Sequence, residues 1–136
     1  MSDLSRFISA QRSDYETALS EIRSGRKRSH WMWYIFPQIA GLGMSYTAQY
    51  YAIKDIEEAR DYISEPYLGS NLIEISEALL KNECSDATAI MGYPDDLKLR
   101  SCMTLFREAA PEKEVFQKVL DKFYGGIPDE RTLELL

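Results

Sequence analysis

The chain has 136 residues, of which 45% are hydrophobic and 28% charged, and its formal net charge is -6 at pH 7. This length suits one domain that buries roughly two thirds of the surface its unfolded form exposes, and the composition is that of an ordered globular protein. The acidic balance argues against general nucleic-acid binding, which needs a broad positive surface to displace counterions from phosphates.

Cysteine usage and the apolar pattern both favour a cytoplasmic protein. The first residues contain no charged leader followed by an apolar run, so we expect no signal peptide. The longest apolar stretch, 31–37, is far too short to cross a bilayer, so we expect no membrane association. Cys84 and Cys102 are the only cysteines, and we predict two buried thiols rather than a disulfide.

The first predicted helix and the apolar run after it open the chain. Ser13 and Glu16 have the spacing of a capping box, apolar residues then recur at helical spacing, and Gly25 supplies a left-handed stop. Periodicity alone does not decide between helix and strand for residues 31–36, although Ser29 can cap a short helix there. We expect this run to be a central buried element.

A cap or a proline marks the start of each later helix. The predicted starts are Asp55, Pro66, Ser85, Pro94, Pro111 and Asp129, and the predicted ends are Gly92, about Ala110, and Gly125. No long alternation of apolar and polar residues and no hairpin dipeptide predicts a sheet. No linker or repeat divides the chain. The prediction is therefore an all-α fold, a compact single-domain bundle of about six to eight mostly short helices over residues 1–136.

Basic residues crowd the end of the first predicted helix. The group comprises Arg23, Arg26, Lys27, Arg28 and His30. Cations at a helix C-terminus complement its dipole, so part of the group has a structural explanation. The alternative is a phosphate or carboxylate clamp, to which the planar fork of arginine is well suited.

An aromatic segment follows the basic group directly. It contains Trp31, Trp33, Tyr34 and Phe36 and leads to Gln38, with Tyr46, Tyr50 and Tyr51 farther along. Aromatic rings beside cations can stack a base while guanidinium groups hold its phosphate, an arrangement that suits a nucleotide. The alternative is that most of these rings pack in the core.

The acid-rich helix predicted from Pro94 carries a second polar group. Asp96 and Arg100 follow one another at four-residue spacing, and Lys98 lies on an adjoining stripe. The alternative here is an exposed face with paired charges. His30, the sole histidine, is either a structural group or, if Asp96 reaches it in the fold, one half of an acid and base pair.

Motifs for metals and common cofactors are absent from the sequence. One histidine and two cysteines are spaced unlike any zinc site, and no P-loop or dinucleotide fingerprint occurs. We therefore predict no metal and no cofactor.

The string from Gly25 to Gln38, followed by Gly41-Leu42-Gly43, resembles the signature of the family catalogued as domain of unknown function 1810. Further segments resemble that family in order and spacing, so the resemblance covers nearly the whole chain; these segments are 51–53, 67–69, 95–101 and 103–106. The resemblance implies a compact, mainly α-helical single domain of bacterial type and supplies no catalytic residues. Members are sometimes labelled calpastatin-like, but a calpain inhibitor would be a disordered segment, whereas this composition predicts a packed core.

Two functional hypotheses emerge from these residues. The first is a small enzyme or sensor that binds a nucleotide-like or otherwise phosphorylated ligand. Its predicted ligand-binding residues are Arg26, Lys27, Arg28, Trp31, Trp33, Gln38, Tyr51, Lys98 and Arg100. If the protein is an enzyme, we expect His30 and Asp96 to hydrolyse an N-glycoside or a phosphate ester.

The second hypothesis is a non-enzymatic protein-interaction module. In this case the basic edge docks an acidic partner and the aromatic segment serves only as core. Burial distinguishes the two hypotheses, because a ligand site needs a cavity beside the tryptophan rings.

Overall fold

The computed structural model describes residues 2–136, which form nine helices and no strand. Their bounds are Ser5–Ser24 (α1), Met32–Ile35 (α2), Tyr46–Tyr50 (α3), Ile56–Ser64 (α4), Pro66–Lys81 (α5), Ala87–Met91 (α6), Asp95–Ala109 (α7), Val115–Tyr124 (α8) and Glu130–Leu135 (α9). An isolated β-bridge joins Ile39 to Ile53. The all-α prediction is confirmed, with α3 as an element that the sequence pattern did not indicate.

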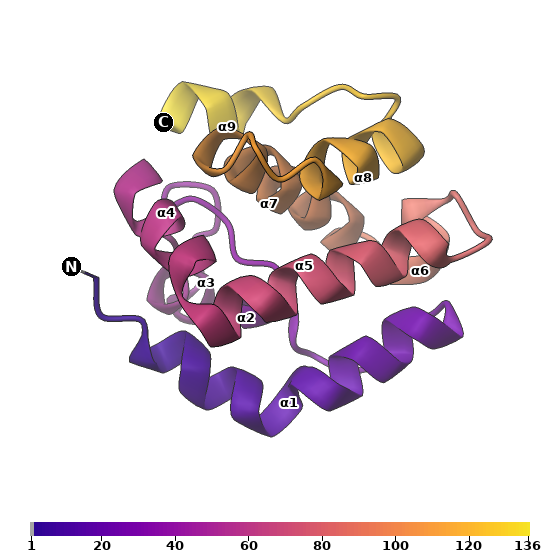
Figure 1. Ribbon diagram of the computed structural model, residues 1–136, viewed down its shortest axis with the longest axis horizontal. Helices are drawn as coiled ribbons and strands as arrows, with labels where there is room; N and C mark the ends of the chain where they lie inside the picture. Colours follow the sequence, from indigo (N-terminus) through magenta and orange to yellow (C-terminus); the bar gives the residue numbers. More distant parts are fainter. Residues whose placement is uncertain (1) are drawn as a thin grey trace.

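The helices stack in layers, with α5 and α7 on the inside (Figure 1). Helix α1 runs along one side of the molecule, α5 crosses the middle, α9 lies on the opposite side, and α7 and α8 lie between α5 and α9. Helix α5 packs against α1, α4 and α8, while α7 packs against α4, α6, α8 and α9. Residues 101–106 of α7 are therefore all buried. The hydroxyl of Thr104 in this stretch donates to the Arg100 carbonyl at 2.8 Å, which satisfies a polar group inside the core.

A row of aromatic rings connects the layers. Phe7 of α1 meets Tyr62 of α4 edge-on at 5.1 Å between ring centroids. Tyr62 lies 5.2 Å from Phe106 of α7, which lies 5.9 Å from Phe116 of α8. All of these side chains are fully buried. Large rings in offset and edge-on contact contribute strongly to a core, so this row ties the first helix to the eighth.

The predicted caps at four helix ends are confirmed. The Asp55 carboxylate accepts from the backbone N–H three residues on at 2.9 Å, and Asp129 does the same at 3.0 Å. Gly25 and Gly125 end α1 and α8 with φ angles of 90° and 63°, in the left-handed region that glycine adopts without strain.

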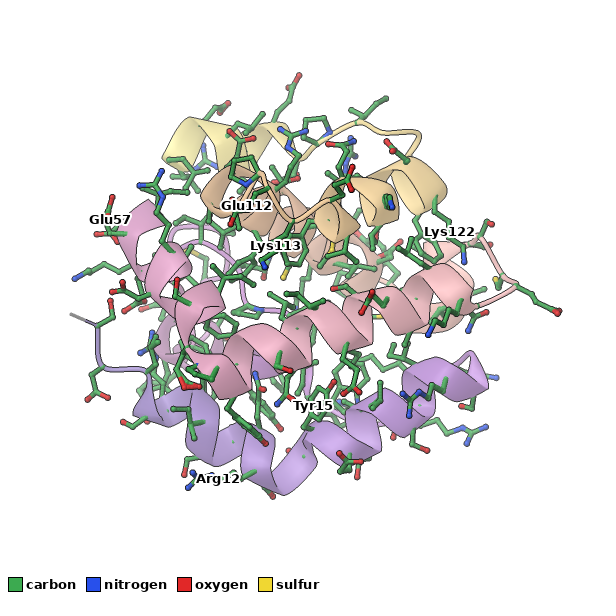
Figure 2. All side chains as sticks on the ribbon, viewed as in Figure 1. Arg12, Tyr15, Glu57, Glu112, Lys113 and Lys122 are labelled. Atoms are coloured by element: carbon green, nitrogen blue, oxygen red, sulfur yellow. The ribbon has the colours of Figure 1, made fainter. Side chains whose placement is uncertain are left out.

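Lysine 122 closes another helix end by a long-range contact. Lys122 of α8 lies at the C-terminal end of α5 (Figure 2), where its ammonium donates to the carbonyls of Leu79 at 2.8 Å and Leu80 at 3.1 Å. It also donates to the Asn82 carbonyl. Because the last carbonyls of a helix have no partner within it, this contact joins α8 to α5.

Several predicted helix starts are wrong. Helix α1 begins at Ser5, so Ser13 lies in its exposed interior, because Phe7 extends the buried face toward the N-terminus. Asp86 rather than Ser85 caps α6, since its carboxylate accepts from the N–H groups of the next turn.

Two further starts differ for local reasons. Helix α8 begins at Val115 because residues 111–114 form a turn after Pro111. Ser29 does not cap α2, because its hydroxyl donates instead to the Glu21 carboxylate at 2.6 Å.

The cysteines only partly match the prediction. Cys102 is buried but Cys84 is half-buried, and both thiols are free.

Among the described residues, no helix has both the length and the apolar character that a bilayer crossing requires.

Candidate functional site

The loop between α1 and α2 is fixed by one buried carboxylate. Glu21 accepts from the backbone N–H groups of Arg28 at 2.7 Å and Ser29 at 3.0 Å, and from the indole N–H of Trp31 at 2.9 Å. Burial acts to raise the pKa of Glu21, but these bonds and the Ser29 hydroxyl outweigh it and lower the pKa to about 2. No sequence pattern singled out Glu21, although it lies on the same helix face as the buried Ala18.

Trp31 and Lys27 are structural rather than free to bind a ligand. Trp31 is only 1% exposed, and the Lys27 Nζ lies 4.9 Å from its ring centroid. Lys27 itself forms an ion pair of 2.9 Å with Asp95, and its side chain is 8% exposed. The prediction that these two residues contact a ring and a phosphate therefore conflicts with their burial.

The exposed basic residues do not gather around a pocket. Arg26, Arg28 and His30 are all exposed, and within residues 2–136 their side chains make no hydrogen bond or ion pair. This arrangement matches the solvated alternative for the basic group.

The predicted pair of His30 and Asp96 is not formed. The Asp96 carboxylate is buried and accepts from the Thr88 hydroxyl at 2.6 Å and the Leu97 N–H at 2.9 Å. It is thus occupied at the start of α7, while the His30 side chain is exposed.

A cleft of about 250 Å³ lies between α7, α9 and the loop that follows α2. Its lining residues are Gln38, Leu42, Gly43, Pro94, Leu97, Lys98, Arg100, Ser101, Asp129 and Arg131. Three predicted ligand-binding residues, Gln38, Lys98 and Arg100, come together here. Arg131 joins them from α9, and no sequence pattern pointed to it, because it lies on a short helix far along the chain from the other cleft residues.

The donor groups of the cleft differ in how many hydrogen bonds and ion pairs they already make within the protein. Arg100 donates to the carbonyls of Ile127 at 2.9 Å and Pro128 at 3.1 Å, so it mainly holds the loop before α9. Lys98 forms an ion pair of 3.5 Å with Asp95 and keeps about a third of its side chain exposed.

Two donors of the cleft are more available. Arg131 forms only a 4.0 Å exposed pair with Glu134, a kind of contact that contributes little. The Gln38 side chain has no hydrogen bond within the part of the chain described. The cleft therefore presents Lys98, Arg131 and Gln38 as groups that can donate to an anionic ligand.

A separate aromatic depression of about 460 Å³ lies in the surface. Its lining residues are Trp33, Tyr34, Tyr46, Thr47, Tyr50 and Tyr51. Lys98 connects the two hollows, because it lines the cleft while its Nζ lies 5.7 Å from the Trp33 ring centroid. The predicted residues Trp33 and Tyr51 thus lie at a surface hollow, whereas Tyr46 and Tyr50 come from the unpredicted α3.

A buried amide positions this aromatic wall. The Gln11 side chain of α1 donates to the Tyr34 carbonyl and the Tyr62 hydroxyl, both at 2.8 Å, and accepts from the Asn71 amide at 3.0 Å. Since buried polar groups need partners, this network fixes α2 against α1, α4 and α5. The α2 side of the depression is therefore fixed to the core.

No cluster of three or more His, Cys, Asp or Glu side chains within residues 2–136 is arranged to hold a metal ion. The chemistry available at the cleft is instead that of charge-assisted hydrogen bonds beside aromatic faces.

The chain matches one protein family and one solved structure along nearly its whole length. A family model described as "Protein of unknown function (DUF1810)" matches residues 1–136. The crystal structure of a conserved hypothetical protein from Mycobacterium tuberculosis is similar to this chain, with 45% sequence identity and a TM-score of 0.96. The similarity covers 98% of this chain and 96% of that chain, so the two proteins share their fold along nearly their whole length. No curated protein matches the sequence.

Proposed function

Since the chain belongs to the DUF1810 family of proteins of unknown function, we propose from its own surface that it binds a phosphorylated, nucleotide-like small molecule. The phosphate lies in the cleft between α7 and α9, and the rest of the ligand lies beside Trp33.

The position of Lys98 between the two hollows is the observation that supports this proposal. Its ammonium lies at the cleft and 5.7 Å from the Trp33 centroid, so one ligand can contact both places. Charge-assisted hydrogen bonds from Lys98 and Arg131 would hold the phosphate. The half-buried Trp33 would supply a face for the remainder of the ligand.

The proposal is confined to binding. His30 is exposed and Asp96 is bonded to Thr88, so hydrolysis of an N-glycoside or a phosphate ester by that pair has no support in their positions.

The positions of the basic residues favour a second candidate function. Arg26, Arg28 and His30 are exposed near one another in sequence, on the loop after α1, and Trp31 is enclosed in the core. These features support an interaction module that docks an acidic protein on its basic edge. The two candidates use different residues, so substitutions separate them.

Calorimetric titration with AMP and with inorganic phosphate tests the first candidate. We expect Lys98→Met and Arg131→Ala each to weaken binding about tenfold, the effect of losing a charge-assisted hydrogen bond of about 1.5 kcal/mol. The matched controls are Arg26→Ala and Arg28→Ala, which remove exposed charges outside the cleft. Unchanged affinity in both cleft variants, or a larger loss in the controls, would contradict the proposal.

A further inference from the structure

The aromatic depression differs from the cleft in charge, and this difference points to a ligand group of its own. We propose that the depression binds a methylated or N-alkylated cation, such as a quaternary ammonium or a pyridinium. A ligand that places its phosphate in the cleft and this cation in the depression is a zwitterion. In this one point the inference rests on the proposed function, which it deepens.

Aromatic rings line the depression from several directions. Tyr34 of α2 lies 5.1 Å from Tyr51 at an angle of 51°, and Tyr51 meets Tyr50 edge-on at 4.8 Å. Tyr50 stacks on Tyr46 at 6.1 Å, and Trp33 completes the lining. Rings set at such different angles can present their electron-rich faces to one enclosed group, which is how proteins recognise quaternary ammonium ions.

A carboxylate at the edge adds negative charge. The Tyr34 hydroxyl donates to the Asp14 carboxylate. Burial first, and then Asp14, raise the pKa of Tyr34. Burial, Tyr50 and Asp14 raise the pKa of Tyr51 as well. Both phenols therefore stay protonated near neutral pH, and Asp14 supplies the negative charge beside them.

Two cations near the depression, Lys98 and Arg6, lie outside its lining, and each also pairs with an acidic side chain. Lys98 pairs with Asp95 at 3.5 Å. Arg6 pairs with Glu58 at 3.2 Å and donates to the carbonyl of Tyr50 at 2.8 Å. No cationic side chain is among the described residues that line the depression. A phosphate placed there would face the electron-rich rings, with the Asp14 carboxylate beside Tyr34 and Tyr51, so a cation is the complementary occupant.

Two of the rings are also openly accessible to a ligand, whereas Tyr34 is buried at the base of the group. Tyr46 is 81% exposed and Tyr50 is 48% exposed. Large aromatic side chains gathered on a surface without a partner are typical of a binding site.

Fluorescence titration with choline, 1-methylnicotinamide and 3,3-dimethylbutan-1-ol tests the inference. The third compound has the shape of choline without its charge, so a cation site must bind it at least tenfold more weakly than choline. Preference for choline over 1-methylnicotinamide would identify a quaternary ammonium, and the opposite preference a pyridinium. Equal binding of choline and its neutral analogue, or no binding of either cation, would overturn the inference.

Variants of the folded protein locate the site. We expect Tyr46→Leu, at a highly exposed position, and Asp14→Asn each to weaken choline binding at least fivefold, with phosphate binding unchanged. The control Arg28→Ala should leave choline binding unchanged. Unaltered choline affinity in Tyr46→Leu would also overturn the inference.

Separate titration of inorganic phosphate distinguishes this inference from the proposed function. Choline binding without phosphate binding would contradict the phosphate cleft and leave the cation site standing. Phosphate binding without choline binding would sustain the cleft and overturn the cation site.

Discussion

Glu21 determines the path of the loop that carries the basic and aromatic residues. Its carboxylate joins α1 to the backbone of residues 28 and 29 and to the Trp31 indole, and it is only 9% exposed. Because a buried carboxylate is costly unless its oxygens accept hydrogen bonds, the loop and the carboxylate stabilise one another.

Replacement of this carboxylate should destabilise the protein strongly. Glu21→Gln places an NH₂ group against the donors of the loop, and we expect the free energy of unfolding at pH 7 to fall by about 3 kcal/mol. Urea denaturation measures this change. Glu16→Gln, an exposed position on the same helix, should change stability by less than about 0.5 kcal/mol. Equal stability of the two variants would contradict the assigned role of Glu21.

The same residue predicts a pH dependence. In the folded protein the pKa of Glu21 is about 2, below its ordinary 4.5. A lowered pKa stabilises the fold fully above the ordinary value, and this contribution disappears as the pH falls from about 4.5 to about 2. Urea denaturation at several pH values should therefore show a steeper loss of stability over this range for the wild type than for Glu21→Gln. Parallel profiles would contradict this assignment.

At the scale of elements, the junction of α4 and α5 depends on close backbone contact. A Cβ atom added at Gly69 of α5 would lie 2.1 Å from the carbonyl oxygen of Ile63, much closer than real atoms approach. The glycine therefore allows α5 to begin directly against the end of α4.

Gly69→Ala should separate these two helices. We expect a loss of about 2 kcal/mol or more, because the contact is with backbone that cannot move aside as a side chain would. Thermal unfolding followed by circular dichroism measures the loss. The neighbouring Ser70→Ala, at an exposed position, is the matched control and should leave the melting temperature nearly unchanged. A Gly69→Ala melting temperature equal to that of the control would contradict the contact.

The candidate site combines short helices with a long one. Helices α2, α3 and α9 contribute aromatic or basic side chains, and each is too short to be stable alone. Helix α7 supplies Lys98 and Arg100 and packs in the core. The geometry of the site therefore depends on the contacts that hold the short helices to the rest of the fold.

For the whole molecule, the row of buried rings from α1 to α8 predicts one cooperative unit. The single domain inferred from the sequence thus remains a prediction with a direct test. Urea unfolding followed by far-UV circular dichroism and by fluorescence of the buried Trp31 should give superimposable transitions, with Trp33→Phe used to isolate the Trp31 signal. Separate midpoints would show that the layers unfold independently.

The sequence by itself determined the features that depend on neighbours along the chain. Helical periodicity predicted the all-α class, and Asp55, Asp129, Gly25 and Gly125 marked helix ends correctly, because caps act on backbone groups within a turn. The five-residue α3 escaped prediction because none of its residues is buried, so it has no apolar period.

Only the tertiary structure decided which residues are available to a ligand. Trp31 and Trp33 are two positions apart, yet the first is enclosed and the second lines a surface hollow. Likewise Lys27 is buried against Asp95, whereas Arg131 reaches the cleft from the far end of the chain. Burial and charge pairing are set by contacts between residues distant in sequence, which local patterns do not encode.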